Sequence, residues 1–343
     1  MLECGAGTPV NRKMNNTVLR RKAIGAALGA VDTISLPLTV MSAVWLKFIR
    51  RADVSRMVLS RAALRRVGIF PIREHYYEPF VRPSYLRRPL QEDRSLPGLD
   101  MNVDGQLEML RQFAYRDELA RFPLDPAAQS KGRHFYYHNH AYGPGDAECL
   151  YSMLRLLRPG RIIEVGSGFS TLMSREAILA NKKECPAYRC EMTCIEPYEQ
   201  PWLETLDVKV VRQAVERVNP ALFSELSAND VLFIDSSHMI RTQGDVLYLY
   251  QEVLPSLPPG VFVHVHDIFT PKDYPYEWLF DQGRMWNEQY LLEMFLALNR
   301  DFRVTIAMNY LAHHHREELG RVFPVLATEP AAYEPGAFWM QRV

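Results

Sequence analysis

The sequence predicts an α/β fold in which helices cover both faces of a doubly wound, mostly parallel sheet. Apolar runs of strand length alternate with helix-forming stretches from residue 161 onward, which is the pattern of repeated strand–helix–strand units. The first run contains Ile162, Ile163 and Val165, a β-branched series typical of a central parallel strand, and it leads into a glycine turn. With 343 residues, 48% of them hydrophobic, the chain can bury a large core around such a sheet.

The spacing of apolar residues assigns the elements in chain order. Helices are expected at 102–121 and 147–157, ahead of the sheet. The alternating region predicts strands at 161–165, 192–196, 208–211, 231–235 and 261–266, with helices at about 171–180, 199–205, 217–226 and 243–254. After it we expect a helix at 287–298, a strand at 302–308 and a final strand at 337–342.

The distribution of charge and proline divides the chain into two parts. Residues 1–99 contain 17 Lys and Arg against 7 Asp and Glu, whereas the rest contains 23 against 33, although the whole chain is neutral. Prolines between residues 71 and 97 interrupt any long element there. We therefore predict a basic helical appendage and connector at 1–100 and the main domain at 101–343. No nucleic acid partner is expected, because the basic clusters are not part of a recognisable nucleic-acid-binding motif.

An apolar segment at 23–46 lies between the basic clusters 20–22 and 47–51, and its only charged residue is Asp32. Its length approaches that of a membrane span, but Asp32, Pro37 and several small residues disfavour insertion. The sequence favours an interfacial helix pair with basic ends, which would give residues 20–51 a peripheral membrane contact at the inner face of the membrane. An equal alternative is a helical module that packs on the main domain or on a second copy of the chain, as in a homo-oligomer.

The cysteines indicate a reducing, cytoplasmic setting. There are five of them, and none forms a paired C-x-x-C spacing, so neither a disulfide framework nor a zinc ribbon is predicted.

The most informative motif is the turn that follows the first strand. Gly166 and Gly168 allow a tight turn and a close ligand approach, and Ser170 and Thr171 can cap the next helix. The third glycine of a dinucleotide fingerprint is missing, because Thr171 occupies that position, so pyrophosphate binding is disfavoured. Glu196 ends the next strand, where a carboxylate can accept both hydroxyls of a ribose. The sequence thus predicts a nucleotide-type cofactor site.

The E-x-G-x-G pattern at 164–168, together with Glu196, resembles class I S-adenosylmethionine (SAM) dependent methyltransferases. This resemblance implies a Rossmann-like body with an antiparallel last strand and a glycine turn that passes under the methionine and ribose of SAM. The cofactor contacts that it implies are Glu164, Gly166, Ser167, Gly168, Glu196, Gln213 (beside Ala214, near adenine) and Asp235.

Acids and histidines follow the fourth and fifth predicted strands. Because the carboxyl ends of neighbouring parallel strands meet at one edge of the sheet, we expect Asp235, His238, His266 and Asp267 to converge. Carboxylates and imidazoles in such an arrangement suit a divalent cation, such as Mg²⁺. Alternatively, Asp235 only positions SAM or the substrate, and the histidines form local hydrogen bonds.

The two strand-end acids resemble the metal positions of the macrocin and rhamnosyl O-methyltransferase group, which includes proteins named cephalosporin hydroxylases. There the metal holds a substrate diol and a histidine can take the proton. The resemblance implies metal ligation by Asp235, His266 and Asp267, and catalysis by His238, Asp235 and His266. This sequence departs from the pattern by placing His266 where an acid is expected beside Asp267. His238 is expected to be the general base, because an ordinary histidine pKa lies near neutrality.

Aromatic segments are expected on both sides of this cluster. The loop 268–285 is a candidate lid, and residues 137–146 would form the opposite rim, with aromatic rings that can stack on a sugar or arene. His264, deeper in its strand, is expected to be a core residue.

We therefore expect a SAM-dependent methyltransferase that acts on a hydroxyl of a small molecule, a sugar or a lipid-linked acceptor. Two other classes stay open. One is a metal-dependent oxygenase or hydroxylase with a facial triad of His238, Asp267 and either His264 or His266. The other is a non-catalytic membrane-associated scaffold that retains the sheet.

Overall fold

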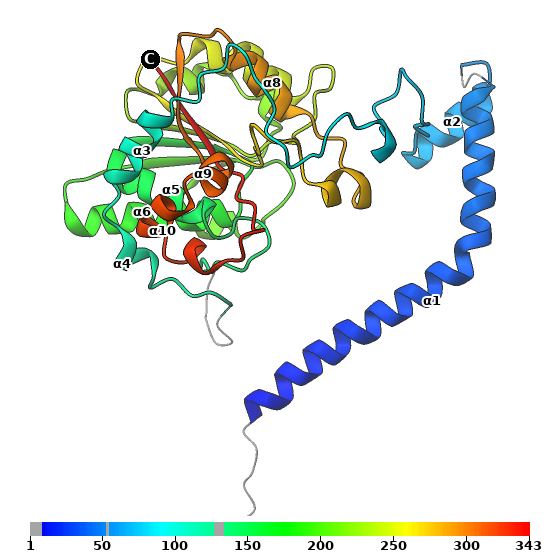
Figure 1. The fold of residues 1–343 in the computed structure, drawn as a ribbon, viewed down its shortest axis with the longest axis horizontal. Helices are drawn as coiled ribbons and strands as arrows, with labels where there is room; N and C mark the ends of the chain where they lie inside the picture. The colour runs from blue at the N-terminus through cyan, green and yellow to red at the C-terminus, as the bar shows by residue number, and fades with distance from the viewer. Residues whose placement is uncertain (1–8, 53–54, 127–133) are drawn as a thin grey trace, which may run out of the picture. The chain divides into compact units, whose positions relative to one another are not determined.

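A seven-stranded mixed sheet organises the larger part of the chain (Figure 1). The computed structural model describes residues 9–52, 55–126 and 134–343, with side chains from residue 23 onward. The strand order is β3-β2-β1-β4-β5-β7-β6. The strands are β1 Arg161–Val165, β2 Glu191–Ile195, β3 Lys209–Val211, β4 Val231–Ile234, β5 Phe262–Val265, β6 Phe302–Ala307 and β7 Phe338–Arg342.

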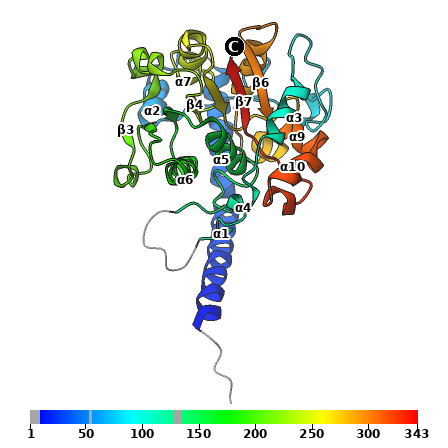
Figure 2. The same ribbon diagram turned by 90° about the vertical axis from the view of Figure 1, so that its left-hand side faces the viewer.

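The pairing confirms the predicted Rossmann-like, mostly parallel sheet. Strands β1 to β5 pair in parallel, with β1 between β2 and β4. The last strand, β7, is antiparallel to both β5 and β6, as expected, and it lies inside the sheet, so that β6 forms the edge (Figure 2). The carboxyl ends of β1, β2, β4 and β5 therefore share one edge of the sheet.

Two helical layers cover the sheet. The helices of this part are α3 Val103–Arg111, α4 Arg116–Leu119, α5 Asp146–Leu157, α6 Phe169–Glu184, α7 Asp245–Tyr248, α8 Glu288–Leu296, α9 Met308–His314 and α10 Arg316–Val322. One hydrophobic cluster joins α5, α6, α9 and α10 to alternate strand residues such as Ile162 and Phe233. The other joins α7 and α8 to the intervening residues, such as Ile163 and Ile234. This alternation shows that the inner strands β1, β2, β4 and β5 bury both of their faces, whereas β3 at the edge is only partly buried.

Several predicted helices are shorter than expected. The stretch 102–121 breaks into α3 and α4, and Phe113 in the break packs on Phe323 with ring centroids 5.9 Å apart. The stretches 199–205 and 217–226 contain only 3₁₀ turns, Leu203–Thr205, Val215–Arg217 and Pro220–Glu225. Asn219 caps the last of these turns by accepting from the backbone N–H of Ala221, and proline at its first position favours a short turn. The stretch 243–254 begins as α7 and continues as a π turn, Leu249–Val253.

The chain divides into two compact units, Met1–Tyr85 and Leu86–Val343. In the second unit, the segment that precedes the sheet packs against it. The Arg94 guanidinium donates to the Glu293 carboxylate and to the carbonyl oxygens of Pro271 and Lys272. The functional boundary that the sequence predicts, after residue 100, stays a prediction.

The first unit contains α1 Pro9–Arg51, α2 Val58–Val67 and a 3₁₀ turn, Pro83–Tyr85. The expected interfacial helix pair is wrong, because α1 is one helix that continues through Pro37. A proline within a helix removes one backbone hydrogen bond and can bend the helix without ending it, and Figure 1 shows α1 bent. The side chains of Arg20, Arg21 and Lys22, part of the proposed membrane contact, lie outside the described residues.

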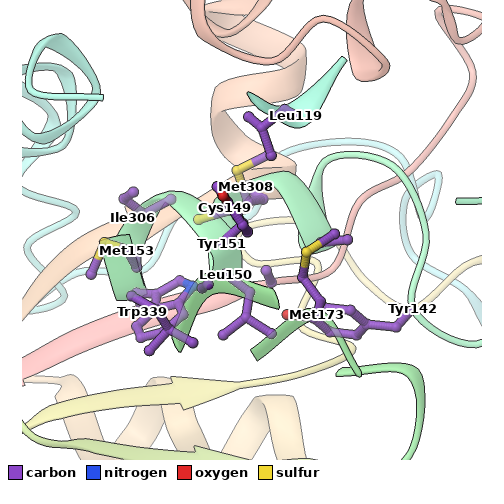
Figure 3. Close-up of a cluster of buried hydrophobic side chains, with 14 of the residues drawn as sticks. Leu119, Tyr142, Cys149, Leu150, Tyr151, Met153, Met173, Ile306, Met308 and Trp339 are labelled. Atoms are coloured by element: carbon purple, nitrogen blue, oxygen red, sulfur yellow. The ribbon is translucent and has the colours of Figure 1, made fainter. Parts of the chain in front are cut away.

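The core between α5 and the sheet includes Trp339 of β7, which is fully buried beside Leu150, Met153 and Ile306 (Figure 3). We expect Trp339→Ala to lower the free energy of unfolding by about 3–5 kcal/mol, because the lost ring leaves a cavity that neighbours on two elements cannot fill. Urea unfolding of the purified protein measures this change. The matched control is Met294→Ala on α8, whose side chain is 73% exposed and should change the stability little. Equal losses in the two variants would contradict this account of the core.

Candidate active site

The glycine turn after β1 is held against the end of β4. Gly166 has φ +76°, and a Cβ atom there would lie 2.0 Å from the backbone oxygen of Asp235. The Asp235 N–H donates to the Val165 carbonyl oxygen at 2.9 Å, and the Gly166 N–H donates to the Ile195 carbonyl oxygen at 3.0 Å. The turn thus joins the ends of three strands, and only glycine fits at its first position.

Glu164 has a positioning role in place of the expected cofactor contact. Its side chain is fully buried, and its two carboxylate oxygens accept the hydroxyls of Ser170 at 2.7 Å and Thr171 at 2.6 Å. The Gly168 N–H in turn donates to the Thr171 hydroxyl at 3.0 Å. This network fixes the start of α6 below the turn, and no surface of Glu164 is left for a ligand.

A cavity of about 380 Å³ opens beside this turn, at the carboxyl ends of β1, β2 and β4. Of the expected cofactor residues, Gly166, Glu196 and Asp235 line it, together with Ala214. Ser167, Gly168 and Gln213 do not, although the Ser167 N–H faces the Glu196 carboxylate at 3.4 Å. The other lining residues are Val165, Ile195, Pro197, Tyr198, Glu199, Val215, Glu216, Ser236, Ser237, Arg241 and Asp245.

The Glu196 carboxylate is aimed by the backbone that follows it. Its Oε1 accepts the N–H groups of Tyr198 at 3.0 Å and Glu199 at 2.9 Å, so the chain curls around the acid. Across the cavity, Asp245 accepts the N–H and the hydroxyl of Ser237 at 2.7 and 2.8 Å, which fixes the loop after β4. The sequence pattern did not identify Asp245, because an acid at the start of a helix is common in any protein.

The acids and histidines after β4 and β5 converge as predicted. Donor atoms of Asp235, His238 and Asp267 all lie within 4.8 Å of one another, which is a geometry that can hold a metal ion. His238 and Asp267 both have φ +57°, a left-handed backbone conformation that is uncommon outside glycine and that clusters at functional sites, although Asp and His adopt it more often than most residues. Of the expected metal ligands, His266 does not belong to this group, and His238 takes its place among the described residues.

His266 lies on the other side of the cluster. Its Nε2 is 3.5 Å from the Asp146 carboxylate at the start of α5, and its Nδ1 is 3.5 Å from Asp235. Burial opposes protonation, but the carboxylates of Asp267 and Asp235 raise the pKa of His266 well above its ordinary value. Asp146 is itself held by the N–H groups of Gly336 and Ala337 at 3.1 and 2.8 Å.

A buried acid on α8, Glu288, completes the environment of His238. The His238 Nδ1 lies 2.8 Å from Glu288, and its Nε2 lies 3.2 Å from Asp235 and 3.6 Å from Asp267. Burial lowers the pKa of His238, but the hydrogen bonds with Asp235 and Glu288 more than reverse this and raise it to about 10. The raised pKa favours the protonated imidazole, so His238 would have to release its proton before it could act as a general base, and that role stays a prediction.

The two aspartates differ in their electrostatics. Burial opposes the ionisation of Asp235, but the charges of His266 and His238 hold its pKa well below the usual range. Burial raises the pKa of Asp267, and the same histidines reverse this only in part. Four carboxylates, Asp146, Asp235, Asp267 and Glu288, thus face two imidazoles, and an excess of acidic groups favours a bound cation.

A second cavity, of about 570 Å³, lies beyond the cluster from the first. His266 and Asp267 line it, so that the cluster separates the two cavities. The proposed lid contributes Phe269 and Trp278, and the opposite rim contributes Tyr137, His138 and Asp146. The remaining lining residues are Asp125, His140, Ala141, Gly143, Pro144, Tyr333, Glu334 and Gly336. Tyr142 and His264, in contrast, belong to the core, where the His264 ring stacks on Phe233 at 4.1 Å.

The facial triad of the oxygenase alternative is not assembled among the described residues. His264 is fully buried against Phe233, and burial lowers its pKa well below the ordinary value. The group that can hold a metal there has two carboxylates and one histidine, and not two histidines and one carboxylate.

Comparison with known proteins supports an enzymatic role for this region. Residues 163–268, which span β1 to β5, match a family model described as a methyltransferase domain. An uncharacterized protein of Archaeoglobus fulgidus is 29% identical over 194 residues, which are 52% of this chain and 85% of that protein. The family match confirms the enzyme class that the sequence predicts, a methyltransferase.

The similar solved structures are distant in sequence. An O-methyltransferase from Bacillus cereus in complex with SAH is 12% identical, with a TM-score of 0.35 over 69% of this chain and 90% of that one. The MycE methyltransferase of the mycinamycin biosynthetic pathway, in complex with Mg, SAH and mycinamycin VI, is 10% identical, with a TM-score of 0.32. That match covers 55% of this chain and 47% of the other, about half its length.

Glu164 gives a prediction about pH. Burial raises the pKa of Glu164 to about 7, although hydrogen bonds from Thr171 and Ser170 oppose the shift. The unfolded chain releases this proton near pH 4.3, so the folded state gains stability from the bound proton at low pH and loses it as the pH rises through 7. We expect the stability of the wild type to fall by roughly 2–3 kcal/mol relative to Glu164→Gln between pH 5 and pH 8.

Urea unfolding at several pH values measures this difference. The control is Glu225→Gln, at an exposed position, whose stability should stay parallel to that of the wild type. Parallel curves for Glu164→Gln would show that the buried carboxylate keeps an ordinary pKa.

Proposed function

We propose that this methyltransferase uses SAM to methylate a hydroxyl oxygen, and that a divalent cation held by the strand-end cluster assists the reaction. The observation that carries the proposal is the cavity bounded by the Gly166 turn, Glu196 and Asp235, which leads to an acidic cluster with a second cavity beyond it. The acceptor class that we propose is a small molecule, a sugar or a lipid-linked hydroxyl. The narrower relation to the macrocin and rhamnosyl O-methyltransferase group belongs to the same proposal.

The first cavity fits an adenosyl cofactor. Glu196 would accept the ribose hydroxyls, Gly166 would let the backbone lie under the sugar, and Asp235 would face the amino acid part. The small side chain of Ala214 leaves room for the adenine ring at the end of β3. SAM supplies an activated methyl group on a sulfonium, and the protein's task is then to orient the acceptor and exclude water.

The cluster fits a divalent cation by its donor set. Asp235 and Asp267 offer hard oxygen ligands, which favour Mg²⁺ or Mn²⁺, and His238 offers an imidazole nitrogen once it releases its proton. Glu288 would then orient the imidazole from behind through the 2.8 Å contact with Nδ1. A cation there would lower the pKa of a bound hydroxyl.

The second cavity suits the acceptor. Phe269 and Trp278 offer apolar ring faces, whereas Asp146 and Glu334 offer hydrogen-bond acceptors for hydroxyl groups. His266 lines this cavity and contacts Asp146. We propose that a cation bound in the cluster would first lower the raised pKa of His266, so that it releases its proton and can then receive the proton of the acceptor hydroxyl. Asp235 and His238 lie on the side of the cluster that faces the first cavity. We propose that their charges orient the methyl donor and the acceptor hydroxyl.

The location and the partners are also proposals. We propose a cytoplasmic enzyme at the inner face of a membrane, with contact through residues 20–51, because α1 carries a long apolar segment between basic clusters. Assembly as a homo-oligomer stays an alternative use of the same helix.

Calorimetry with SAM tests the cofactor proposal. We expect the purified protein to bind SAM, and we expect Glu196→Gln to weaken binding about 10- to 100-fold, because it loses charged hydrogen bonds to the ribose. Glu225→Gln, which removes an exposed carboxylate outside both cavities, should bind as the wild type does. Absence of heat with folded wild-type protein would overturn the proposal.

Thermal unfolding with Mn²⁺ tests the cation proposal. A cation that binds only the folded state raises Tm with concentration, so Mn²⁺ should stabilise the wild type. Asp267→Asn should lose this increase, whereas Asp207→Asn, at an exposed position, should keep it. An equal increase in all three proteins, or none in the wild type, would favour the alternative in which the cluster holds no metal.

A further inference from the structure

The described part of α1 is exposed along its whole apolar segment. None of the apolar window within Ala23–Arg51 is buried, and its mean hydropathy is 1.6. Leu28, Ile34, Leu36 and Val44 are each more than half exposed. A helix turns by about 100° per residue, so these four side chains lie on four different sides of it. Asp32, Ser35, Thr39 and Ser42 share one side of the helix, but the Ser35 and Thr39 hydroxyls donate to backbone carbonyl oxygens of the same helix. The strongly charged face of an interfacial helix is therefore missing from this segment, in which Asp32 is the only charged residue.

The length of the apolar segment matches a bilayer. Residues 23–46 extend about 36 Å at about 1.5 Å per residue, and the hydrocarbon core of a bilayer is about 30 Å thick. Asp32 is the only charged residue in this segment. Trp45 and Phe48, whose rings stack at 5.5 Å, lie near its carboxyl end, where aromatic rings favour the interface between lipid and water.

Cations gather at the carboxyl end of the segment. A cavity of about 630 Å³ within the first unit is lined there by Lys47, Arg50, Arg51 and Arg73, among others. Arg50 is paired with Glu78, and Glu74, which also lines the cavity, is paired with Arg82. No ion pair is seen for Lys47, Arg51 or Arg73 among the described residues, so the cavity keeps an excess of positive charge. Positive charges at the end of an apolar helix attract anionic phospholipid headgroups.

We propose that residues 23–46 of α1 are inserted in a phospholipid bilayer as one spanning helix, and that the basic cavity at its end faces anionic lipid headgroups. The bilayer supplies the apolar surroundings that all sides of the helix require, and the cations outside it limit the depth of insertion. The enzyme is thereby anchored where a lipid-linked or membrane-dissolved acceptor is concentrated.

Cell fractionation of the full chain tests the proposal. The wild type should stay in membranes washed with high salt and alkaline carbonate, with at least about tenfold more protein in the pellet than in the supernatant. Val31→Arg combined with Val40→Arg places two charges at exposed positions within the segment and should reverse this ratio. The matched control, Val58→Arg combined with Leu59→Arg on α2, adds the same charges at exposed positions outside it and should fractionate as the wild type does.

Binding to vesicles tests the headgroup contact. Replacing Lys47, Arg51 and Arg73 with glutamine should weaken binding to phosphatidylcholine vesicles that contain phosphatidylglycerol, and should leave binding to pure phosphatidylcholine unchanged. Circular dichroism of each variant checks that the helices remain folded.

Four outcomes would overturn the proposal. Wild-type protein released by salt alone would indicate a peripheral contact, and wild-type protein soluble as an oligomer would indicate that the helix packs on a second copy. An intact mass that lacks residues 1–46 would indicate a cleaved targeting segment. Identical fractionation of the wild type and the Val31→Arg, Val40→Arg variant would show that the segment is not inserted.

Discussion

The close approach of the Gly166 turn to the end of β4 is the constraint on which the site depends. Because the position of a Cβ at Gly166 is occupied by the Asp235 backbone oxygen, the two strand ends are locked together at the distance of a backbone contact. The Gly166 N–H also ties the turn to β2, so Glu196 and Asp235 lie on opposite sides of one turn. A larger residue would separate β1 from β4 and open the edge on which both cavities depend.

Buried acids hold this edge in place. Glu164 fixes the start of α6, Asp146 fixes the backbone before β7, and Glu288 fixes the His238 ring, each through short contacts with backbone or side-chain donors. Burying a carboxylate is costly unless hydrogen bonds compensate it, and at Glu164 the raised pKa reveals the part of the cost that remains. These buried carboxylates therefore fix the geometry of the site at a cost to the free energy of folding.

The sequence predicted the sheet well because strands buried on both faces have continuous apolar runs. It also predicted that Gly166, Glu196, Asp235, His238 and Asp267 come together, because each follows a strand whose carboxyl end must lie at the same edge. Glu164 was misjudged because its position in the motif gives no sign that Ser170 and Thr171 occupy both of its oxygens. Glu288 could not be found, because an acid at the start of a helix looks ordinary until the helix is packed against the strand ends. The helix pair was wrong because α1 continues through Pro37 as one helix, and the sequence does not show whether such a proline bends a helix or ends it.

Because the acidic cluster lies between the two cavities, a cation has to bind before the acceptor hydroxyl can lose its proton. A cluster with four carboxylates and two protonated imidazoles resists further negative charge, so an acceptor hydroxyl cannot ionise beside it without a compensating cation. A sulfonium in the first cavity and a divalent cation between Asp235, His238 and Asp267 would both supply positive charge on the side from which the methyl group comes. Cation binding would displace the proton of His238, whose nitrogen would then be a ligand, and would lower the pKa of His266, which is not in the ligand group and could then accept a proton. The carboxylates of Asp235 and Glu288, which raise the pKa of His238 in the cluster, would have to share their negative charge with a bound cation.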